Sequence, residues 1–433
     1  MQDILDLAMK VADSAEVFRI SSKKTLLQFE SNRLKNVETK QISQITLRLI
    51  TNGRIGIASA TEASNQHDLV NEAKELTRLG NEVKFNFPQI VQCPHVIVDD
   101  KSTGLITLEE MNKLGEELVS LIRQYNPDII CQARVLKDTV SICIVNSCGG
   151  QADYSKTLFS LGIEGTLVRD TDMLFVGETQ SSCRPLAEPE VISNVVIKQL
   201  DSSRNKASVR NGVLPVIFTP NGVASALMPS LITALNGKTV FNNASPLGSK
   251  LGELVFDRKL TIHDDPLINY RPGSRPCDDE GIPSQITPLI MEGVVSNFLY
   301  DLQTASLAGV ETTGNGSRNR GGLPSPSPSS LVIAPGNIDF HEIIGDVKEG
   351  LLVEWLMGTT QGNVLGGDFS GNVLLGYKIE NGKVVGRLKN TMISGNVYKL
   401  LDDIIAVSRD TKWVGSYLLT PYIYCPKLSV ASK

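Results

Sequence analysis

The run of residues 211–237 contains no charged side chain, and this feature restricts the fold more than any other. A helix of this length could cross a bilayer. The run contains Pro215, Pro220 and Pro229, however, and proline interrupts helical hydrogen bonding. We therefore predict a short Val/Ile/Phe strand followed by a separate apolar helix, buried in a protein core rather than in a membrane.

The composition is that of an ordinary folded protein. Its 433 residues exceed the usual length of a single core, so two or three domains are expected. Hydrophobic residues make up 41% and charged residues 21%, which is far from the composition of a disordered chain. The net charge of -5 gives no broad positive field for phosphates, so we expect no direct contact with nucleic acid.

The N-terminal segment and the cysteines indicate a cytoplasmic protein. Residues 1–18 carry acidic side chains at Asp3, Asp6 and Asp13, whereas a signal peptide begins with basic residues and an unbroken apolar run. The seven cysteines include no C-x-x-C pair, which fits reduced thiols in the cytosol.

The order of periodic segments predicts an α+β fold. We expect an N-terminal α+β domain over 1–95, a middle α/β segment over 104–207, and a strand-rich domain over 212–433. The first is a helix-on-sheet portion and the last is built from antiparallel hairpins. Segments rich in Pro and polar residues separate them, at 85–103 and 202–212.

The N-terminal portion carries the clearest local signals. Ile45, Leu47 and Leu49 alternate with polar residues up to Asn52-Gly53, a dipeptide typical of two-residue hairpins. One face of this sheet is therefore expected to be buried and the other polar. Thr107 and Glu110 form a capping box ahead of an apolar helical stripe. Further strands are predicted over 16–20 and 25–30, and helices over 2–12, 68–79 and 190–200.

Two more hairpin turns are predicted in the C-terminal domain, at Glu292-Gly293 and Asn381-Gly382. Between them, residues 312–330 are too rich in Gly, Ser and Pro for regular structure, so an irregular segment is expected there.

The histidines do not provide a helical two-histidine zinc site. His341-Glu342 begins like the metallopeptidase motif, but Gly345 and Asp346 occupy the positions where a second histidine would close it. We therefore interpret His341 as part of a polar helix start. The other three histidines are expected to be structural: His67, His95 and His263, the last in a turn.

Three other motifs resemble known kinds of site. The acidic run 278–280 could hold a divalent cation, but it lacks calcium-loop spacing and is predicted to be a solvated turn. The run 367–371 resembles a nucleophile elbow, with its serine one position from the required place. Gly314 and Gly316 with Arg318 and Arg320 could cradle an anion, yet they do not join a strand to a helix. A mobile loop is the preferred interpretation there.

Several segments in order resemble the TldD/PmbA family, and more closely its PmbA (TldE) branch. In the N-terminal part these are AEVFRISSKKTLLQFESNRLKNVETK and LRLITNGRIGIAS. In the C-terminal part they include DDEGIPSQITPLIMEGVVSNFLYDLQTASLAG, TTGNGSRN, GTTQGNVLGGDFSGNVLLGYKIENGKVVG and ISGNVYKLLDDIIAVSRD. The resemblance runs over nearly the whole chain.

The resemblance implies a cytosolic assembly in which a TldD-type chain, carrying zinc, pairs with a PmbA-type chain to cleave unfolded or extended peptides. The zinc helix of the TldD type, His-Glu-x-x-x-His, should correspond to residues 221–236 here, which contain neither His nor Glu. Pro229 should also kink or break this helix. We therefore expect no catalytic, cofactor-binding or metal-binding residue in this chain, with the zinc in a TldD-like partner. Cys425 resembles a thiolate of the catalytic chain, but one sulfur is not a site.

The resemblance also implies the partners, which are a TldD-like catalytic subunit and an extended peptide. A homodimer is an option for the isolated chain. We predict that the peptide adds to a sheet edge near residues 364–373. The tentative peptide-binding residues are Asn363, Val364, Gly367, Asp368 and Ser370. Two alternatives stay open: a peptide- or protein-binding regulator of the gyrase-modulator type, and an independent hydrolase that uses the carboxylates of 278–280.

Overall fold

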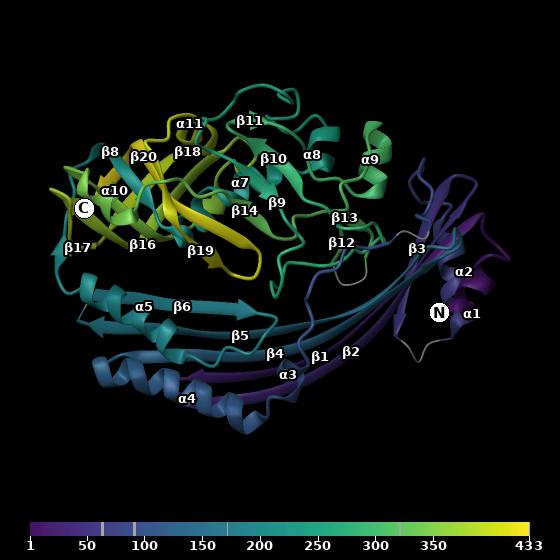
Figure 1. Cartoon of the computed structure of the whole chain (residues 1–433), viewed down its shortest axis with the longest axis horizontal. Helices are drawn as coiled ribbons and strands as arrows, with labels where there is room; N and C mark the ends of the chain where they lie inside the picture. The colour runs from purple at the N-terminus through teal and green to yellow at the C-terminus, as the bar shows by residue number, and fades with distance from the viewer. Residues whose placement is uncertain (62–64, 90–91, 171, 320–321, 433) are drawn as a thin grey trace.

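Two large sheets, one from each half of the chain, form the framework of the molecule. The computed structural model describes residues 1–61, 65–89, 92–170, 172–319 and 322–432. Figure 1 shows a long, curved N-terminal sheet running beneath the C-terminal domain and continuing beyond it to the chain's N-terminus. The structure confirms the predicted α+β class.

The N-terminal sheet has six antiparallel strands in the order β3-β2-β1-β4-β5-β6. Segments 1–95 and 104–207 each supply three of these strands, and pairing between β1 and β4 joins them. The strands are β1 (Ser14–Glu30), β2 (Arg33–Thr51), β3 (Arg54–Thr61), β4 (Ile130–Asn146), β5 (Gln151–Arg169) and β6 (Asp172–Ser182).

The local signals of this half are largely confirmed. Asn52 and Gly53 have φ of 51° and 69°, as a two-residue hairpin turn requires. The strands predicted at 16–20 and 25–30 are instead one continuous strand, β1. Its polar middle stays extended because Ser21 is paired on both sides, with Ser43 of β2 and Ser141 of β4.

Helices cover the two ends of the six-stranded sheet. Near its N-terminal end, α1 (Gln2–Ala8) and α2 (Gln66–Leu76) pack on β1 to β3 through an apolar cluster that includes Leu47 and Leu69. The short α3 (Lys101–Leu105) precedes α4 (Leu108–Tyr125), whose predicted capping box at Thr107 is present. At the other end, α4 and α5 (Pro189–Ser202) share a core with β4 to β6 and with one face of the C-terminal sheet.

The C-terminal sheet has twelve strands, ordered β11-β10-β9-β14-β20-β8-β15-β16-β17-β7, with β18 between β16 and β20 and β19 on β20. Most neighbours are antiparallel. The strands are β7 (Lys206–Ala207), β8 (Gly212–Phe218), β9 (Ile262–Asp264), β10 (Thr287–Met291), β11 (Val294–Val295), β14 (Leu331–Ile333), β15 (Glu349–Met357), β16 (Asp368–Glu380), β17 (Lys383–Leu388), β18 (Thr391–Asn396), β19 (Ala406–Val414) and β20 (Leu418–Ser432).

The hairpin turns predicted at Glu292-Gly293 and Asn381-Gly382 are confirmed, because all four residues have φ between 47° and 79°. The remaining elements are short. They are α8 (Gly237–Phe241), α9 (Leu302–Ala308), α10 (Phe340–Gly345), α11 (Val397–Asp402), the 3-10 helix η1 (Thr359–Gln361) and the two-stranded ribbon of β12 (Gly316–Arg318) and β13 (Pro324–Pro326).

The uncharged run folds as predicted, into a buried strand and separate helical segments. It forms β8, then α6 (Pro220–Ala226) and α7 (Met228–Ala234). The helix breaks at Leu227, because Pro229 in the first turn of α7 cannot donate to the preceding turn. Leu227 and Leu231 are fully buried in the C-terminal core. None of the helices in the described part of the chain has the length and apolar character needed to cross a bilayer.

Candidate functional site

Four charged side chains meet where the two halves of the chain touch. Glu16 of β1 and Arg48 of β2 come from the N-terminal sheet, and Glu280 and Arg318 come from the C-terminal domain. All four side chains are at most 1% exposed. Arg48 binds Glu16 through two nitrogens, Nε to Oε1 at 3.0 Å and Nη2 to Oε2 at 2.8 Å, and its Nη1 donates to Glu280 Oε1 at 2.8 Å. Arg318 Nη2 also donates to Glu16.

These contacts keep the buried charges compensated. Burial alone would lower the pKa of Arg48, but Glu16 and Glu280 raise it above its ordinary value. The second oxygen of Glu280 accepts from the Leu302 amide at 2.8 Å. Because each charge has a partner, the network fixes the N-terminal sheet against the C-terminal domain.

The acidic run 278–280 is not the solvated turn that we predicted. Asp278 and Glu280 are fully buried. Asp278 accepts from three amides, those of Glu280, Ile282 and Gly316, at 2.8 to 2.9 Å. Burial, and then the charge of Glu280, raises the pKa of Asp278 to about 7. The run is a structural hub because the N-terminal sheet covers it, which local composition does not reveal.

Residues 312–330 were predicted to be irregular, with a mobile loop at Gly314, Gly316 and Arg318, yet this loop is anchored. Asn315 is buried and donates to Asp264 Oδ2 at 2.7 Å, and Arg318 lies in β12. A Cβ on Gly316 would lie 2.5 Å from Glu280 Oε2, so this position requires glycine. Arg320 lies outside the described residues.

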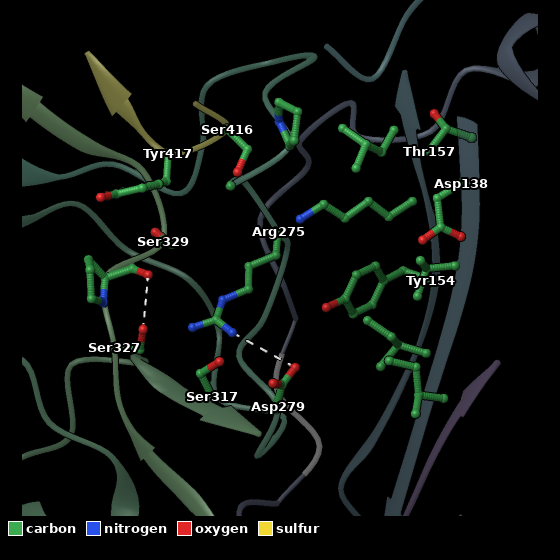
Figure 2. A pocket seen from close by; sticks show the side chains of 18 of the residues that line it. Asp138, Tyr154, Thr157, Arg275, Asp279, Ser317, Ser327, Ser329, Ser416 and Tyr417 are labelled. Atoms are coloured by element: carbon green, nitrogen blue, oxygen red, sulfur yellow. Dashed lines mark hydrogen bonds and ion pairs between the residues drawn. The ribbon is translucent and has the colours of Figure 1, made fainter. Parts of the chain in front are cut away.

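A cleft of about 610 Å³ opens beside this network, between the two halves of the chain. One wall is formed by β4 and β5, with Asp138, Tyr154 and Thr157, and the opposite wall carries Ser329 and Tyr417. Figure 2 shows Arg275 between these walls, with its guanidinium toward Asp279. The remaining polar side chains of the cleft are Lys156, Ser317, Ser327 and Ser416.

The predicted peptide-binding residues lie elsewhere, at the start of β16. Asn363, Asp368 and Ser370 are exposed, Val364 is partly buried and Gly367 is buried. Residues 368–371 of β16 pair with β18 on one side, residues 373–376 pair with β15 on one side, and residues 377–380 lie between β15 and β17. An added strand is therefore blocked on both sides only at residue 372 and over 377–380. Binding of peptide by the exposed side chains stays a prediction.

The four histidines are dispersed. His341 lies in the first turn of α10 and is exposed, as predicted, and His67 and His95 are exposed as well. His263 is not in a turn but in β9, between β10 and β14. Among the described residues, no three His, Cys, Asp or Glu side chains are grouped so as to hold a metal ion.

The buried side chains of the segment that should correspond to a zinc helix are apolar, except for that of Ser230. Val223, Leu227, Met228 and Leu231 of α6–α7 and the link between them pack into the C-terminal core. Cys425 of β20 is also fully buried, with its Sγ 3.7 Å from the Leu400 carbonyl oxygen. The donors that zinc uses in proteins, imidazole, thiolate and carboxylate, do not converge here, so the residues present do not fit a zinc ion.

Sequence reasoning missed Glu16, Arg48, Lys156 and Arg275 as members of the site. Arg48 alternates with Leu47 and Leu49, and the pattern placed it on the polar face of the sheet. One signal was available. In the sequence Glu16 stands between the apolar residues Ala15 and Val17-Phe18, and a charge in such a strand requires a partner if the strand is buried.

Comparison with solved structures identifies the class of fold. The crystal structure of TldE from Thermococcus kodakarensis superimposes with a TM-score of 0.92, at 22% sequence identity, covering 100% of both chains. A proposed modulator of a DNA gyrase from Thermotoga maritima superimposes with a TM-score of 0.91, at 22% identity, covering 99% of both chains. The fold is therefore that of the TldE-like proteins.

Sequence comparison identifies the family. The model of the PmbA/TldA metallopeptidase C-terminal domain matches residues 211–432, and that of domain 1 of the same family matches residues 15–78. A metalloprotease TldD homolog of Haemophilus influenzae is 31% identical over 198 residues, which are 46% of this chain and 41% of that protein. The chain belongs to the PmbA/TldD family, as the resemblance of its sequence segments indicated.

Proposed function

We propose that this chain is a non-catalytic subunit of a zinc metallopeptidase, which pairs with a TldD-like chain to cleave unfolded or extended peptides. One observation carries the proposal. The helical segment α6–α7, where the family resemblance expects the zinc ligands, presents Leu227, Met228 and Leu231 to the core and contains no His or Glu. Peptide hydrolysis by zinc needs ligands and a general base at that place.

The location of this segment supports a role beside the substrate. Ile232 of α7 lines the cleft between the two halves of the chain. A chain that keeps the family scaffold but lacks the metal donors can still shape a binding surface. In the proposed division of labour, the partner would hold zinc, which polarises the scissile carbonyl and activates water. This chain would bind and orient the peptide.

The proposal is tested by mixing this chain with a TldD-like chain from the same organism. Cleavage of an unstructured fluorogenic peptide should appear in the mixture, and it should disappear when the histidines of the partner's His-Glu-x-x-x-His helix are replaced. After dialysis, zinc should be found in the TldD-like chain and in the mixture, and not in this chain alone. If the partner alone cleaves as fast as the mixture, or this chain alone cleaves in excess chelator, the subunit role is wrong.

A second experiment asks where the peptide binds. Hydrogen exchange with saturating peptide should show protection either at residues 363–370 or around the cleft. Ser370→Trp adds bulk at an exposed position of β16. If residues 363–370 bind peptide, this variant should slow turnover of the mixture and leave its zinc content unchanged. Met357→Trp, at an exposed position of neighbouring β15, is the matched control.

The name of the Thermotoga maritima protein suggests another function, the regulation of DNA gyrase. The net charge of -5 disfavours direct contact with DNA, so a regulator of this kind would act by binding protein. The mixing experiment separates the two functions, because a gyrase regulator has no reason to increase peptide cleavage by a TldD-like chain.

A further inference from the structure

Arg275 has one edge of its guanidinium without a partner. The residue is 8% exposed and lines the cleft. Its Nη1 donates to the Gly316 carbonyl oxygen at 3.3 Å and lies 3.8 Å from Asp279 Oδ1. Its Nε and Nη2 are buried and have no acceptor within the described part of the chain. Buried donors without acceptors are costly, so an oxygen atom that accepts from both would be favoured there.

The Nε and Nη2 edge of Arg48 shows which kind of group such an edge binds. Arg48 holds the Glu16 carboxylate with its Nε and Nη2, at 3.0 and 2.8 Å. This parallel pair of N–H groups matches the two oxygens of a carboxylate. The free edge of Arg275 offers the same two donors.

A second cation is close to Arg275. Lys156 of β5 lines the cleft, is partly buried, and has no ion pair or side-chain hydrogen bond with any residue that the structure describes. Burial, and then the repulsion from Arg275, lowers the pKa of Lys156 to about 8. An anion between the two cations would relieve this repulsion.

The other walls of the cleft restrict the anion. Asp138 and Asp279 also line it, so a singly charged group fits better than a phosphate dianion. Ile20, Ile142 and Ile232 supply apolar wall beside the cations. A volume of about 610 Å³ is that of a site for a small organic molecule or a few residues rather than for an ion alone.

We propose that the cleft binds a carboxylate of a peptide, side-on to the Nε and Nη2 of Arg275 and against the Lys156 ammonium. The inference depends on the proposed function only in taking a peptide as the molecule that carries the carboxylate. The group is either the C-terminal carboxylate or the side chain of an Asp or Glu residue. Both have the same chemistry, and experiment distinguishes them.

The test measures binding of fluorescent unstructured peptides to the isolated full chain by anisotropy. One peptide has a free C-terminus, the second is its C-terminal amide, and the third is the amide with one internal Glu; the first two contain no Asp or Glu. The free acid should bind at least about tenfold more tightly than the amide, as expected for loss of a charge-assisted contact. If the third peptide binds as tightly as the free acid, the site also accepts a side-chain carboxylate.

Two variants assign the contact to the cleft. Lys156→Met and Arg275→Met should each abolish the preference for the free acid. The control Lys35→Met, at an exposed lysine of β2, should retain it. Arg275→Met removes a contact to Gly316, so its thermal midpoint is measured as well, whereas Lys156→Met breaks no contact of the described structure. Equal affinity for acid and amide, or an unchanged preference in Lys156→Met, would overturn the proposal.

The outcome is separable from that of the proposed function. If the mixture cleaves peptides but the isolated chain binds the free acid and the amide equally, the subunit role stands and the carboxylate site is wrong. If the isolated chain binds the free acid more tightly but does not increase peptide cleavage by a TldD-like partner, the carboxylate site stands and the subunit role is wrong.

Discussion

Arg48 Nη1 donates to Glu280 Oε1 at 2.8 Å, although the two residues are 232 positions apart in the sequence. The contact joins β2 of the N-terminal sheet to the acidic run that supports the Asn315–Gly316 segment. It shows that the two halves of the chain are held together by compensated charges in a fully buried setting.

Arg48→Met should lower the free energy of unfolding by about 3–5 kcal/mol, because it leaves Glu16 and Glu280 buried without their shared cation. The urea midpoint measures this. The matched control is Arg210→Met, since Arg210 pairs with Glu349 at 3.2 Å while 71% exposed. It should cost at most about 1 kcal/mol. An equal loss of unfolding free energy in both variants would mean that the buried network stabilises the protein no more than an exposed ion pair does.

Gly316→Ala should destabilise the protein by about 1–3 kcal/mol, because the new methyl group would lie 2.5 Å from Glu280 Oε2 and 3.0 Å from Asp278 Oδ2. Thermal unfolding is the measurement. Gly345→Ala is the control, because a Cβ there meets nothing within 4 Å. A Gly316→Ala protein as stable as the wild type would show that the ribbon can move away from the acidic run.

Asp172 should make the junction sensitive to acid. Burial raises its pKa, but hydrogen bonds from Arg387 and Lys206 outweigh this and hold the pKa well below 3.8. A carboxylate whose pKa is lower in the folded state stabilises fully above its unfolded pKa, and this stability is lost as pH falls below it. The thermal midpoint of the wild type should therefore exceed that of Asp172→Asn most at pH 6, and the difference should shrink below about pH 4.

The control for this pH series is Glu116→Gln, which removes an exposed carboxylate from α4. Its small difference from the wild type should change little between pH 6 and pH 3. A constant difference between the wild type and Asp172→Asn over the same range would contradict the linkage.

Lys156 should react with amine-acylating reagents at pH 8 far faster than ordinary lysines. With a pKa of about 8, roughly half of its amines are neutral, against well under about 1% for an unperturbed lysine. Peptide mapping by mass spectrometry measures the rate. Arg275→Gln should slow the reaction, because removing the repelling cation raises the pKa. Labelling of Lys156 at the rate of exposed Lys35 would refute the shift.

The features that the sequence predicted well depend on neighbouring residues. The turns at Asn52-Gly53, Glu292-Gly293 and Asn381-Gly382 follow from the ease with which Asn and Gly adopt positive φ. The capping box at Thr107 needs only Glu110, three residues later. The helix break before Pro229 follows from a missing N–H.

The errors have a different origin. The acidic run and the described residues of 312–330 have the composition of exposed loops. The acidic run is buried beneath the N-terminal sheet, whereas the segment is anchored by Asp264 of β9 and, through Arg318, by Glu16. The strand pattern placed Arg48 on a polar face of the sheet. At Arg48 this face is not exposed to solvent but is buried against Glu280 of the C-terminal domain.

The sequence by itself determined the local elements, the broken apolar helix and the absence of His and Glu from residues 221–236, because each is a property of a short stretch of chain. Only the tertiary structure decided that Glu16, Arg48, Glu280 and Arg318 form one network and that Lys156 and Arg275 line one cleft. Burial and charge compensation depend on which distant strands pack together, and no local pattern of residues encodes that choice.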